Sequence, residues 1–288
     1  MSSVWVAGEA LIDLVPSAGE RVAVVGGGAA NTAKALARLE IDTAFVGGIS
    51  LDGYGKQIAG ELAEVDLSLS LRSELPTALA IVSLDEKGSA SYEFKLAETA
   101  TFDFQREWLP SGAPEVLHVG TLATIVEPGA SALFEWASGL GAPIVFDPNI
   151  RPSVLSDRVR YREIVELWAS ISRVVKLSDE DLDWLGYESA AELLEMGPEL
   201  VVLTRGSEGM VGYSKAGLVS VPGVKVTVAD TVGAGDTVGA VIVEGLVKYG
   251  VERLKDEVLF DVLSRAAKAA SITCSRVGAN PPTAAEIN

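Results

Sequence analysis

The sequence predicts an α/β fold in which a central, mostly parallel sheet is covered by helices on both faces. Short apolar runs alternate along the chain with segments whose apolar residues recur at helical spacing. Gly is frequent, with 29 copies, and many glycines cluster between the apolar runs, as in strand-to-helix turns. A chain of 288 residues can bury a sizeable core, and we expect one domain spanning residues 1–288.

Glycines bound the elements at the start of the chain. The apolar residues 4–7 end at a glycine and predict the first strand. Three glycines at 26–28 precede residues 29–39, whose small and apolar residues have helical spacing, so a glycine turn leads into a helix. Residues 43–46 predict the next strand and residues 54–64 the next helix. The first two glycines of the 26–28 cluster also suit a hinge.

A different pattern between residues 67 and 97 predicts a small antiparallel flap. Residues 79–84 and 89–94 have strand composition, and the four residues between them, Asp85-Glu86-Lys87-Gly88, have the composition of a hairpin turn. We expect residues 67–97 and 12–24 to form a lid attached to the main body. Because an open apolar sheet edge is prone to pairing, we also expect a homodimer formed through the lid.

The strand–helix rhythm returns after residue 110. Short apolar runs predict strands at residues 116–119, 144–146, 174–177, 201–204, near 210 and 218, and at 224–228. Helical spacing predicts helices at residues 130–140, 157–170, 178–185, 234–248 and 256–274. Strands that alternate with helices form a parallel sheet covered on both faces.

The charge of the chain limits its partners. Lys plus Arg number 23 and Asp plus Glu number 40, so the formal net charge is −17. Such a surface repels nucleic acid and anionic membranes, and we expect neither as a partner. It also repels a nucleotide, so a nucleotide site would need local positive potential from Mg²⁺, backbone amides and a few basic side chains.

Cysteine and histidine each occur once. Cys274 cannot form an intrachain disulfide, and no apolar run approaches the ~18 residues of a membrane span, so we expect a cytoplasmic protein. His118 stands in an apolar run and is expected to be a buried structural residue. A single histidine disfavours zinc sites and nucleophile triads that depend on histidine.

The strongest signal for chemistry is the segment DTVGAGD at residues 230–236, between a Val-rich run and an apolar helix. Gly233 and Gly235 allow a tight turn that brings successive N–H groups close to an anion, and the helix dipole adds positive potential there. Asp236 then stands in the first helical turn, beside that anion. Donors for a phosphoryl group and a carboxylate that takes a hydroxyl proton are the parts that phosphoryl transfer needs.

Other interpretations exist for this segment and for the other glycine-rich segments. Asp236 could simply cap the helix while the glycines make a turn. The glycine cluster at 26–31 ends in Asn where a dinucleotide fingerprint requires Gly, and the pair Gly55-Lys56 lacks the other residues of a phosphate-binding P-loop. Dehydrogenases of the Rossmann type and P-loop enzymes are therefore disfavoured.

Several segments together resemble the ribokinase-like (PfkB) family of carbohydrate kinases, and within it the fructokinase branch. The matching segments are GEALID at 8–13, GGGAANTA at 26–33, GGISLDGYG at 47–55, DPNIR at 147–151, VKLS at 175–178 and DTVGAGD at 230–236. The resemblance implies a ribokinase-like three-layer fold, with a mostly parallel sheet flanked by helices and a small antiparallel β lid. It also implies ATP and Mg²⁺ as cofactors, and K⁺ as a monovalent cation.

The resemblance assigns roles to matching positions. Asp236 would be the catalytic base, and Gly233, Ala234 and Gly235 the anion hole. Residues expected to contact the sugar are Asp13, Gly27, Gly28, Asn31 and Arg151. Residues expected around the nucleotide are Lys176, Ser178, Thr204, Gly206, Gly209 and Gly235, with Asp181 reaching Mg²⁺ through water. Residues expected around the monovalent cation, mostly through backbone atoms, are Asp230, Val232, Thr273, Arg276 and Gly278.

Some of these positions have simpler alternatives, and some depart from the family pattern. Asp13 could cap a loop, Gly27 could be only a hinge, and Arg151 could form a surface ion pair. At position 238 this chain has Val where relatives usually have Phe, and Ser178 and Asp181 stand where ribokinases have Asn and Glu. Ala267 stands where a ribokinase Asn contacts adenine. Lys95-Leu96 stands where many relatives have an Arg that reaches the sugar.

We therefore expect an ATP-dependent sugar kinase that transfers the γ-phosphoryl group to a primary hydroxyl of a monosaccharide, with fructose as the first candidate. Alternative acceptors are 2-keto-3-deoxygluconate, ribose or a nucleoside. An alternative of another class is a sugar-binding sensor on the same scaffold that lacks useful catalysis.

Overall fold

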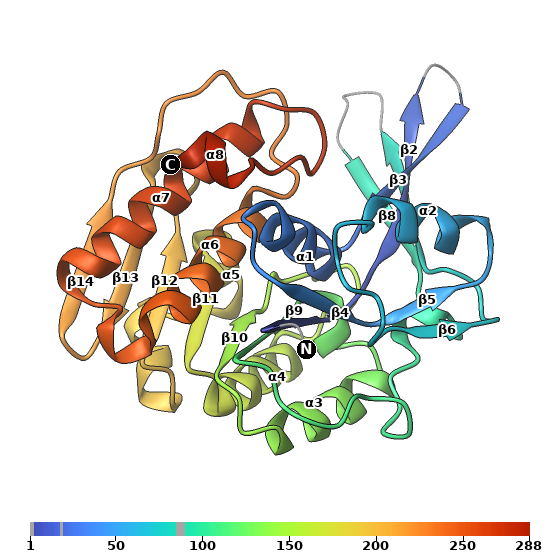
Figure 1. Ribbon diagram of the computed structural model, residues 1–288, viewed down its shortest axis with the longest axis horizontal. Coiled ribbons are helices and arrows are strands. Elements are labelled where there is room, and N and C mark those ends of the chain that lie inside the picture. The colour runs from blue at the N-terminus through green and yellow to red at the C-terminus, as the bar shows by residue number, and fades with distance from the viewer. Residues whose placement is uncertain (1–2, 18–19, 85–89) are drawn as a thin grey trace.

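A computed structural model describes residues 3–17, 20–84 and 90–288, and it confirms the predicted α/β class (Figure 1). The central sheet has eight strands in the order β14-β13-β12-β11-β10-β9-β1-β4. Six of them pair in parallel, whereas β13 at one edge is antiparallel to both of its neighbours, β12 and β14. The strands are β1 (Val4–Ala7), β4 (Thr43–Val46), β9 (Val116–Gly120), β10 (Ile144–Asp147), β11 (Val174–Ser178), β12 (Leu200–Thr204), β13 (Met210–Ser214) and β14 (Gly217–Val221).

Helices cover both faces of this sheet, as expected for buried parallel strands. One face carries α1 (Gly28–Arg38), α2 (Gly53–Glu61), α6 (Ala234–Tyr249), α7 (Asp256–Cys274) and α8 (Ala284–Ile287). The other face carries α3 (Gly129–Gly139), α4 (Arg158–Ile171) and α5 (Asp179–Leu185). Successive residues of β1 show the division, because Val4 and Val6 belong to the first apolar core and Trp5 and Ala7 to the second.

A four-stranded sheet projects from the end of the central sheet at which β4 lies (Figure 1). Its order is β3-β2-β7-β8, from β2 (Leu11–Ser17), β3 (Glu20–Gly26), β7 (Leu79–Leu84) and β8 (Ala90–Lys95). Strands β7 and β8 pair antiparallel as predicted, and β2 and β3 also pair antiparallel, but β2 and β7 join the two pairs by parallel pairing, so the sheet is mixed. The turn expected at residues 85–88 lies outside the described residues.

Shorter elements complete the fold. Strands β5 (Gly48–Ser50) and β6 (Leu71–Ser73), which the sequence did not predict, form a separate two-stranded parallel sheet. Short 3₁₀ helices are η1 (Ala100–Phe102), η2 (Thr121–Thr124), η3 (Ala190–Met196), η4 (Gly206–Glu208) and η5 (Val251–Arg253). Within the ranges given above, the structure contains no helix that is both long enough and apolar enough to cross a membrane.

The strand predicted at residues 224–228 is wrong. The chain between β14 and α6 has no regular structure there, although its alternating valines satisfy a strand pattern. Val224, Val226 and Val228 are 48%, 38% and 58% exposed. Because the central sheet ends at β14, the valines have no neighbouring strand to pair with.

Candidate active site

Two predicted site residues, Ser178 and Thr204, lie at the carboxyl ends of parallel strands, where α/β proteins bind ligands. Thr121, Asp147, Ser178 and Thr204 stand at or just after the ends of β9 to β12. Helix α6 begins close to the same edge, because Lys176 of β11 approaches Gly235 in its first turn. The topology therefore brings the DTVGAGD segment to the place where several strand ends converge.

The start of α6 is built by glycine. Gly233 has a φ of 77°, in the left-handed region, and a Cβ at this position would lie 2.7 Å from Cβ of Ala279. Only glycine fits such a turn without strain. No side chain among the described residues caps this helix, so its first N–H groups remain an electropositive terminus suited to an anion.

Asp236 is buried in the first turn of α6 and paired with Asn31. The amide Nδ2 of Asn31, in the first turn of α1, donates a hydrogen bond of 2.8 Å to Oδ2 of Asp236, across 205 residues of sequence. Burial raises the pKa of Asp236 to about 6; the Asn31 hydrogen bond and the charges of Lys176 and Arg151 oppose that shift. The carboxylate is therefore more basic than an ordinary Asp and still ionised at neutral pH.

A buried ion pair lies beside this carboxylate. Lys176 Nζ donates a hydrogen bond of 2.8 Å to Oδ2 of Asp147, and both side chains are almost fully buried. Burial disfavours the charge on Lys176, but Asp147 outweighs it and raises the lysine pKa. A Cβ at Gly235 would lie 3.0 Å from Lys176 Nζ, so the ammonium group faces the predicted anion hole directly.

Asp13 projects from the small sheet. Burial raises its pKa to about 6, and the charge of Arg151 counteracts part of that effect. A Cβ at Gly26, on the paired strand β3, would lie 2.1 Å from Asp13 Oδ2, so a side chain at this position would displace the carboxylate. The guanidinium of Arg151 is folded back onto its own backbone, where Nη1 donates to the carbonyls of Asn149 and Ile150 at 3.2 and 2.9 Å.

Ser178 and Asp181 form a capping box at the start of α5. Ser178 Oγ accepts the Asp181 N–H at 3.0 Å, and Asp181 Oδ2 accepts the Ser178 N–H at 3.0 Å. Asp181 Oδ1 accepts a third N–H, from Ile150, at 2.8 Å. Both carboxylate oxygens thus accept backbone N–H groups.

The predicted cation loops meet at Asp230. Its Oδ1 accepts the Val232 N–H at 3.1 Å and its Oδ2 accepts the Gly278 N–H at 2.9 Å. The Thr273 hydroxyl lies 3.0 Å from that of Thr237, linking α7 to α6, and Arg276 pairs with Glu286. These loops adjoin the turn at Gly233, through its close approach to Ala279.

The remaining predicted nucleotide residues occupy the end of β12 and the turn after it. Thr204 Oγ1 donates to the Leu177 carbonyl at 3.4 Å. Gly206 and Gly209 have φ values of 48° and 100°, which make the η4 turn possible. Ala267 is buried within the core on α7, so it presents almost no surface to a base, and Val238 is likewise a core residue.

Sequence reasoning gave no role to Glu9, although the structure places it, fully buried, between β1 and β2. Its carboxylate accepts hydrogen bonds from Gly28, Thr121 and Ala123. These partners lie 19, 112 and 114 residues away along the chain, so no local pattern could reveal them. The only available signal was the place of Glu9 in the GEALID segment.

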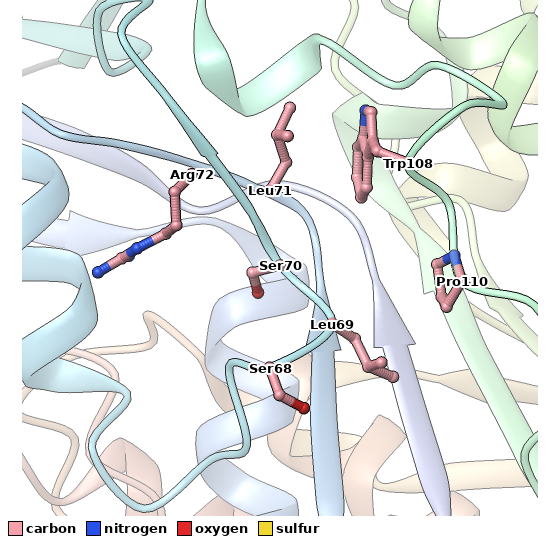
Figure 2. Close-up of a pocket in the computed structure, with 7 residues that line it drawn as sticks. All are labelled: Ser68, Leu69, Ser70, Leu71, Arg72, Trp108 and Pro110. Atoms are coloured by element: carbon pink, nitrogen blue, oxygen red, sulfur yellow. The ribbon is translucent and has the colours of Figure 1, made fainter.

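Two other features are separate from the site. His118 is buried under α6, 3.4 Å from a Cβ built at Gly239, and burial lowers its pKa to about 3, so the ring is neutral. A cavity of about 270 Å³ is lined by Ser68, Leu69, Ser70, Leu71, Arg72, Trp108 and Pro110, none of which is a predicted site residue (Figure 2).

A family model for pfkB family carbohydrate kinases matches residues 1–286. The chain belongs to the pfkB family of carbohydrate kinases. The kinase is 40% identical to a fructokinase of Rhizobium leguminosarum bv. trifolii, over 83% of this chain and 78% of that one. It is 31% identical to a fructokinase of Salmonella typhimurium, over 87% and 86% of the two chains.

Solved structures agree with this assignment. A fructokinase from Xylella fastidiosa with bound ATP superposes with a TM-score of 0.91 at 26% identity, covering 100% of the kinase and 97% of the other chain. A fructokinase from Vibrio cholerae O395 with fructose, ADP and a calcium ion gives 0.82 at 29% identity, covering 97% and 94%. The ribokinase-like fold expected from the sequence is therefore confirmed.

Proposed function

We propose that the kinase transfers the γ-phosphoryl group of ATP to a primary hydroxyl of fructose, with Asp236 as the base. The observation that carries this proposal is the position of Asp236. The carboxylate is buried at an uncapped helix N-terminus, has a pKa of about 6, and is held by Asn31. A carboxylate ionised at neutral pH beside an anion-binding turn suits proton removal from a hydroxyl that attacks a phosphoryl group.

The sugar site lies between the small sheet and α1. Asp13, Asn31, Gly27 and Gly28 present a carboxylate, an amide and open backbone to a polyol, which offers both donors and acceptors. The raised pKa of Asp13 reflects burial that a bound sugar would increase. As a lid, the small sheet would exclude water from the reacting groups when it closes over the sugar.

The nucleotide phosphates would lie along the start of α6. The amides of residues 233–235 and the ammonium of Lys176 supply the positive potential that an acidic protein needs at such a site. Arg151 is the further cation that could turn from its own backbone toward a phosphate. Thr204, Gly206 and Gly209 would line the nucleotide beyond them, and the exposed side chains of Val232 and Val277 offer apolar surface to the base.

Mg²⁺ fits the site as a hydrated ion bound to phosphates. Within the described residues no cluster of three or more His, Cys, Asp or Glu side chains is present, so the protein offers few direct ligands. Mg²⁺ typically keeps several waters and binds through one or two carboxylates and substrate phosphates, where it neutralises charge on the phosphoryl oxygens. Asp181 is the carboxylate placed to hold one of those waters.

A monovalent cation fits the loops around Asp230. Asp230, Val232, Thr273, Arg276 and Gly278 bring a carboxylate and backbone carbonyls together, and oxygen atoms are the ligands of hard cations. The loops adjoin Gly233, so K⁺ bound there would stiffen the anion-binding turn. The cytoplasm is the compartment that an ATP-dependent sugar kinase with one free cysteine implies.

We also infer a homodimer that forms through the small sheet. Strand β3 is an edge of that sheet, and Val22 and Val24 on it are 49% and 40% exposed. Val24 pairs with Asp13, so these valines share the face that carries the sugar-binding carboxylate. A second copy covering this face would bury the valines and the open edge. Light scattering at micromolar concentration should show a dimer, and a monomer alone would refute the inference.

A screen of ADP release tests the function. The acceptors are fructose, 2-keto-3-deoxygluconate, ribose and a nucleoside, each with ATP and Mg²⁺. Fructose should give the highest kcat/KM. A higher kcat/KM for another acceptor would show that fructose is not the preferred substrate, although the reaction would still be phosphoryl transfer. Thermal stabilisation by a sugar without ADP release would indicate a sensor.

A further inference from the structure

Glu9 lies in the short segment that connects β1 of the central sheet to β2 of the small sheet. Only 1% of its surface is exposed, and three donors converge on its carboxylate. The Gly28 N–H donates at 2.9 Å, the Ala123 N–H at 3.1 Å, and the Thr121 hydroxyl donates to the same oxygen as Gly28. The carboxylate therefore joins α1 to the turn that follows β9.

Helix α1 depends on Glu9 for its cap. The N-cap position is Gly27, which has no side chain, so the first N–H groups of α1 need a partner from elsewhere. Glu9 provides two acceptors, because its carboxylate accepts the Gly28 N–H and its backbone carbonyl accepts the Ala30 N–H at 3.2 Å. One residue from the link thus satisfies two donors of the first turn.

The backbones approach closely enough that glycine is required on both sides of this contact. A Cβ at Gly8 would lie 2.5 Å from Cβ of Ala29. A Cβ at Gly27, whose φ is 106°, would lie 2.6 Å from the Glu9 carbonyl oxygen. The position of α1 relative to Glu9 is therefore fixed by direct backbone packing.

The same first turn of α1 carries Asn31. The Asn31 N–H donates to the Gly27 carbonyl at 3.0 Å, and its side chain donates to Asp236. On the other side, a Cβ built at Gly28 would lie 2.5 Å from Cγ2 of Thr121 and 3.3 Å from Oδ1 of Asp236. Glu9 thus binds Gly28, which approaches Asp236, and Thr121, which packs against Gly28.

We propose that Glu9 is a positioning residue that fixes Asn31, and through it Asp236, by capping α1 and binding the turn at Thr121. This proposal rests on the proposed function in one respect, the role of Asp236 as the base. Burial raises the pKa of Glu9 to about 7 against the effect of its hydrogen bonds. An ionisable group retained in so apolar a place is costly for stability, which favours a role beyond packing.

The test compares Glu9→Gln with a matched control, Thr43→Val. Gln keeps the size of Glu but turns an N–H₂ group toward one of the three donors. Thr43, the first residue of β4, is also buried, and its hydroxyl donates to the Ile41 carbonyl at 2.8 Å, away from the site. Both variants should lose thermal stability, but only Glu9→Gln should lower kcat, by about tenfold to a hundredfold, since small misplacements of catalytic groups have effects of this size.

KM and amide exchange separate positioning from general stability. In Glu9→Gln, KM for ATP should stay within about twofold of wild type while kcat falls. Hydrogen exchange at the amides of Gly28 and Ala123, measured without substrate, should be faster at one or both of them in Glu9→Gln, because an amide nitrogen replaces one of the two acceptor oxygens, and unchanged in Thr43→Val. An unchanged kcat in folded Glu9→Gln, or unchanged exchange at these amides, overturns the proposal.

A second pair of variants applies if Glu9→Gln does not fold. Thr121→Val removes one donor to Glu9 and should lower kcat, whereas Thr121→Ser retains the hydroxyl and should recover most of it. Equal kcat in the two variants overturns the proposal. If the wild type phosphorylates no acceptor in the ADP screen, the proposed function is at fault, whereas the exchange measurement still decides the capping role of Glu9.

Discussion

Replacing Asn31 with Ala should move the pH dependence of the reaction. The Asn31 amide donates to Asp236 at 2.8 Å and lowers the pKa of that carboxyl, which burial alone would place higher than its value of about 6. A hydrogen bond to a charged group contributes about 1.5–3 kcal/mol, and 1.36 kcal/mol corresponds to one pKa unit, so the variant should shift by about one to two units. The sign is upward, because the amide stabilises the ionised form.

The assay is kcat/KM for the sugar between pH 5 and 9, at saturating ATP. A base must be ionised, so kcat/KM should rise with pH through about 6 in the wild type, and the same rise should occur about one to two units higher in Asn31→Ala. The plateau will also fall, since Asn31 is a proposed sugar contact, but the position of the rise is independent of that loss. Asn280→Ala, which removes a hydrogen bond to Arg38 outside the site, is the matched control.

A rise that stays at the same pH in Asn31→Ala would refute the reasoning. Either the Asn31 contact would then contribute nothing to the ionisation of Asp236, or another group would control the rate. Asp13 also has a pKa near 6, so an unmoved rise would favour that carboxylate as the titrating group.

Further predictions concern stability and the sugar site. Burial raises the pKa of Asp236 from 3.8 to about 6, so its charge destabilises the folded state above pH 6 and not below about pH 4. Asp236→Asn should therefore raise the free energy of unfolding at pH 8 by up to about 3 kcal/mol and leave it unchanged at pH 4. Denaturant unfolding that shows no gain at pH 8 would contradict this prediction. Gly26→Ala should raise KM for the sugar about tenfold with KM for ATP unchanged, because the new methyl group would displace Asp13; equal KM values in variant and wild type would show that Asp13 does not bind the sugar. Lys176→Met should destabilise the protein by about 3–5 kcal/mol, because it leaves Asp147 charged and unpaired. In urea unfolding, the double variant Lys176→Met/Asp147→Leu should recover most of that loss. A double variant that is no more stable than Lys176→Met would contradict this prediction.

The regular part of the fold follows from local patterns. Strands β1, β9, β10, β11 and β12 are short apolar runs buried on both faces, so composition alone marks them. The valines at 224, 226 and 228 also have a strand-like pattern, but within the described part of the chain no strand lies beside them. The prediction failed there because strand formation depends on a neighbouring strand, which the local sequence does not reveal. The parallel pairing of β2 with β7 escaped prediction for the same reason.

The candidate site also has a part that local sequence predicts and a part that only the fold reveals. Asp236 and its glycines were found because the chemistry is contained in seven consecutive residues. The contact between Asn31 and Asp236, the Lys176–Asp147 pair and the cap provided by Glu9 join segments that are far apart in the chain, so only the fold brings them together. The family resemblance implied ligand contacts for Asn31 and Lys176, whereas their protein partners required three-dimensional structure.

Single-turnover kinetics of Asp236→Asn test the central claim most directly. The variant keeps the shape of the site and the Asn31 neighbour but cannot accept a proton. Sugar and ATP binding, measured by calorimetry, should stay near wild type, while the rate of phosphoryl transfer should fall by at least about a hundredfold, the scale of general base catalysis. A transfer rate close to that of the wild type, with both substrates bound, would contradict the role of Asp236 as the base.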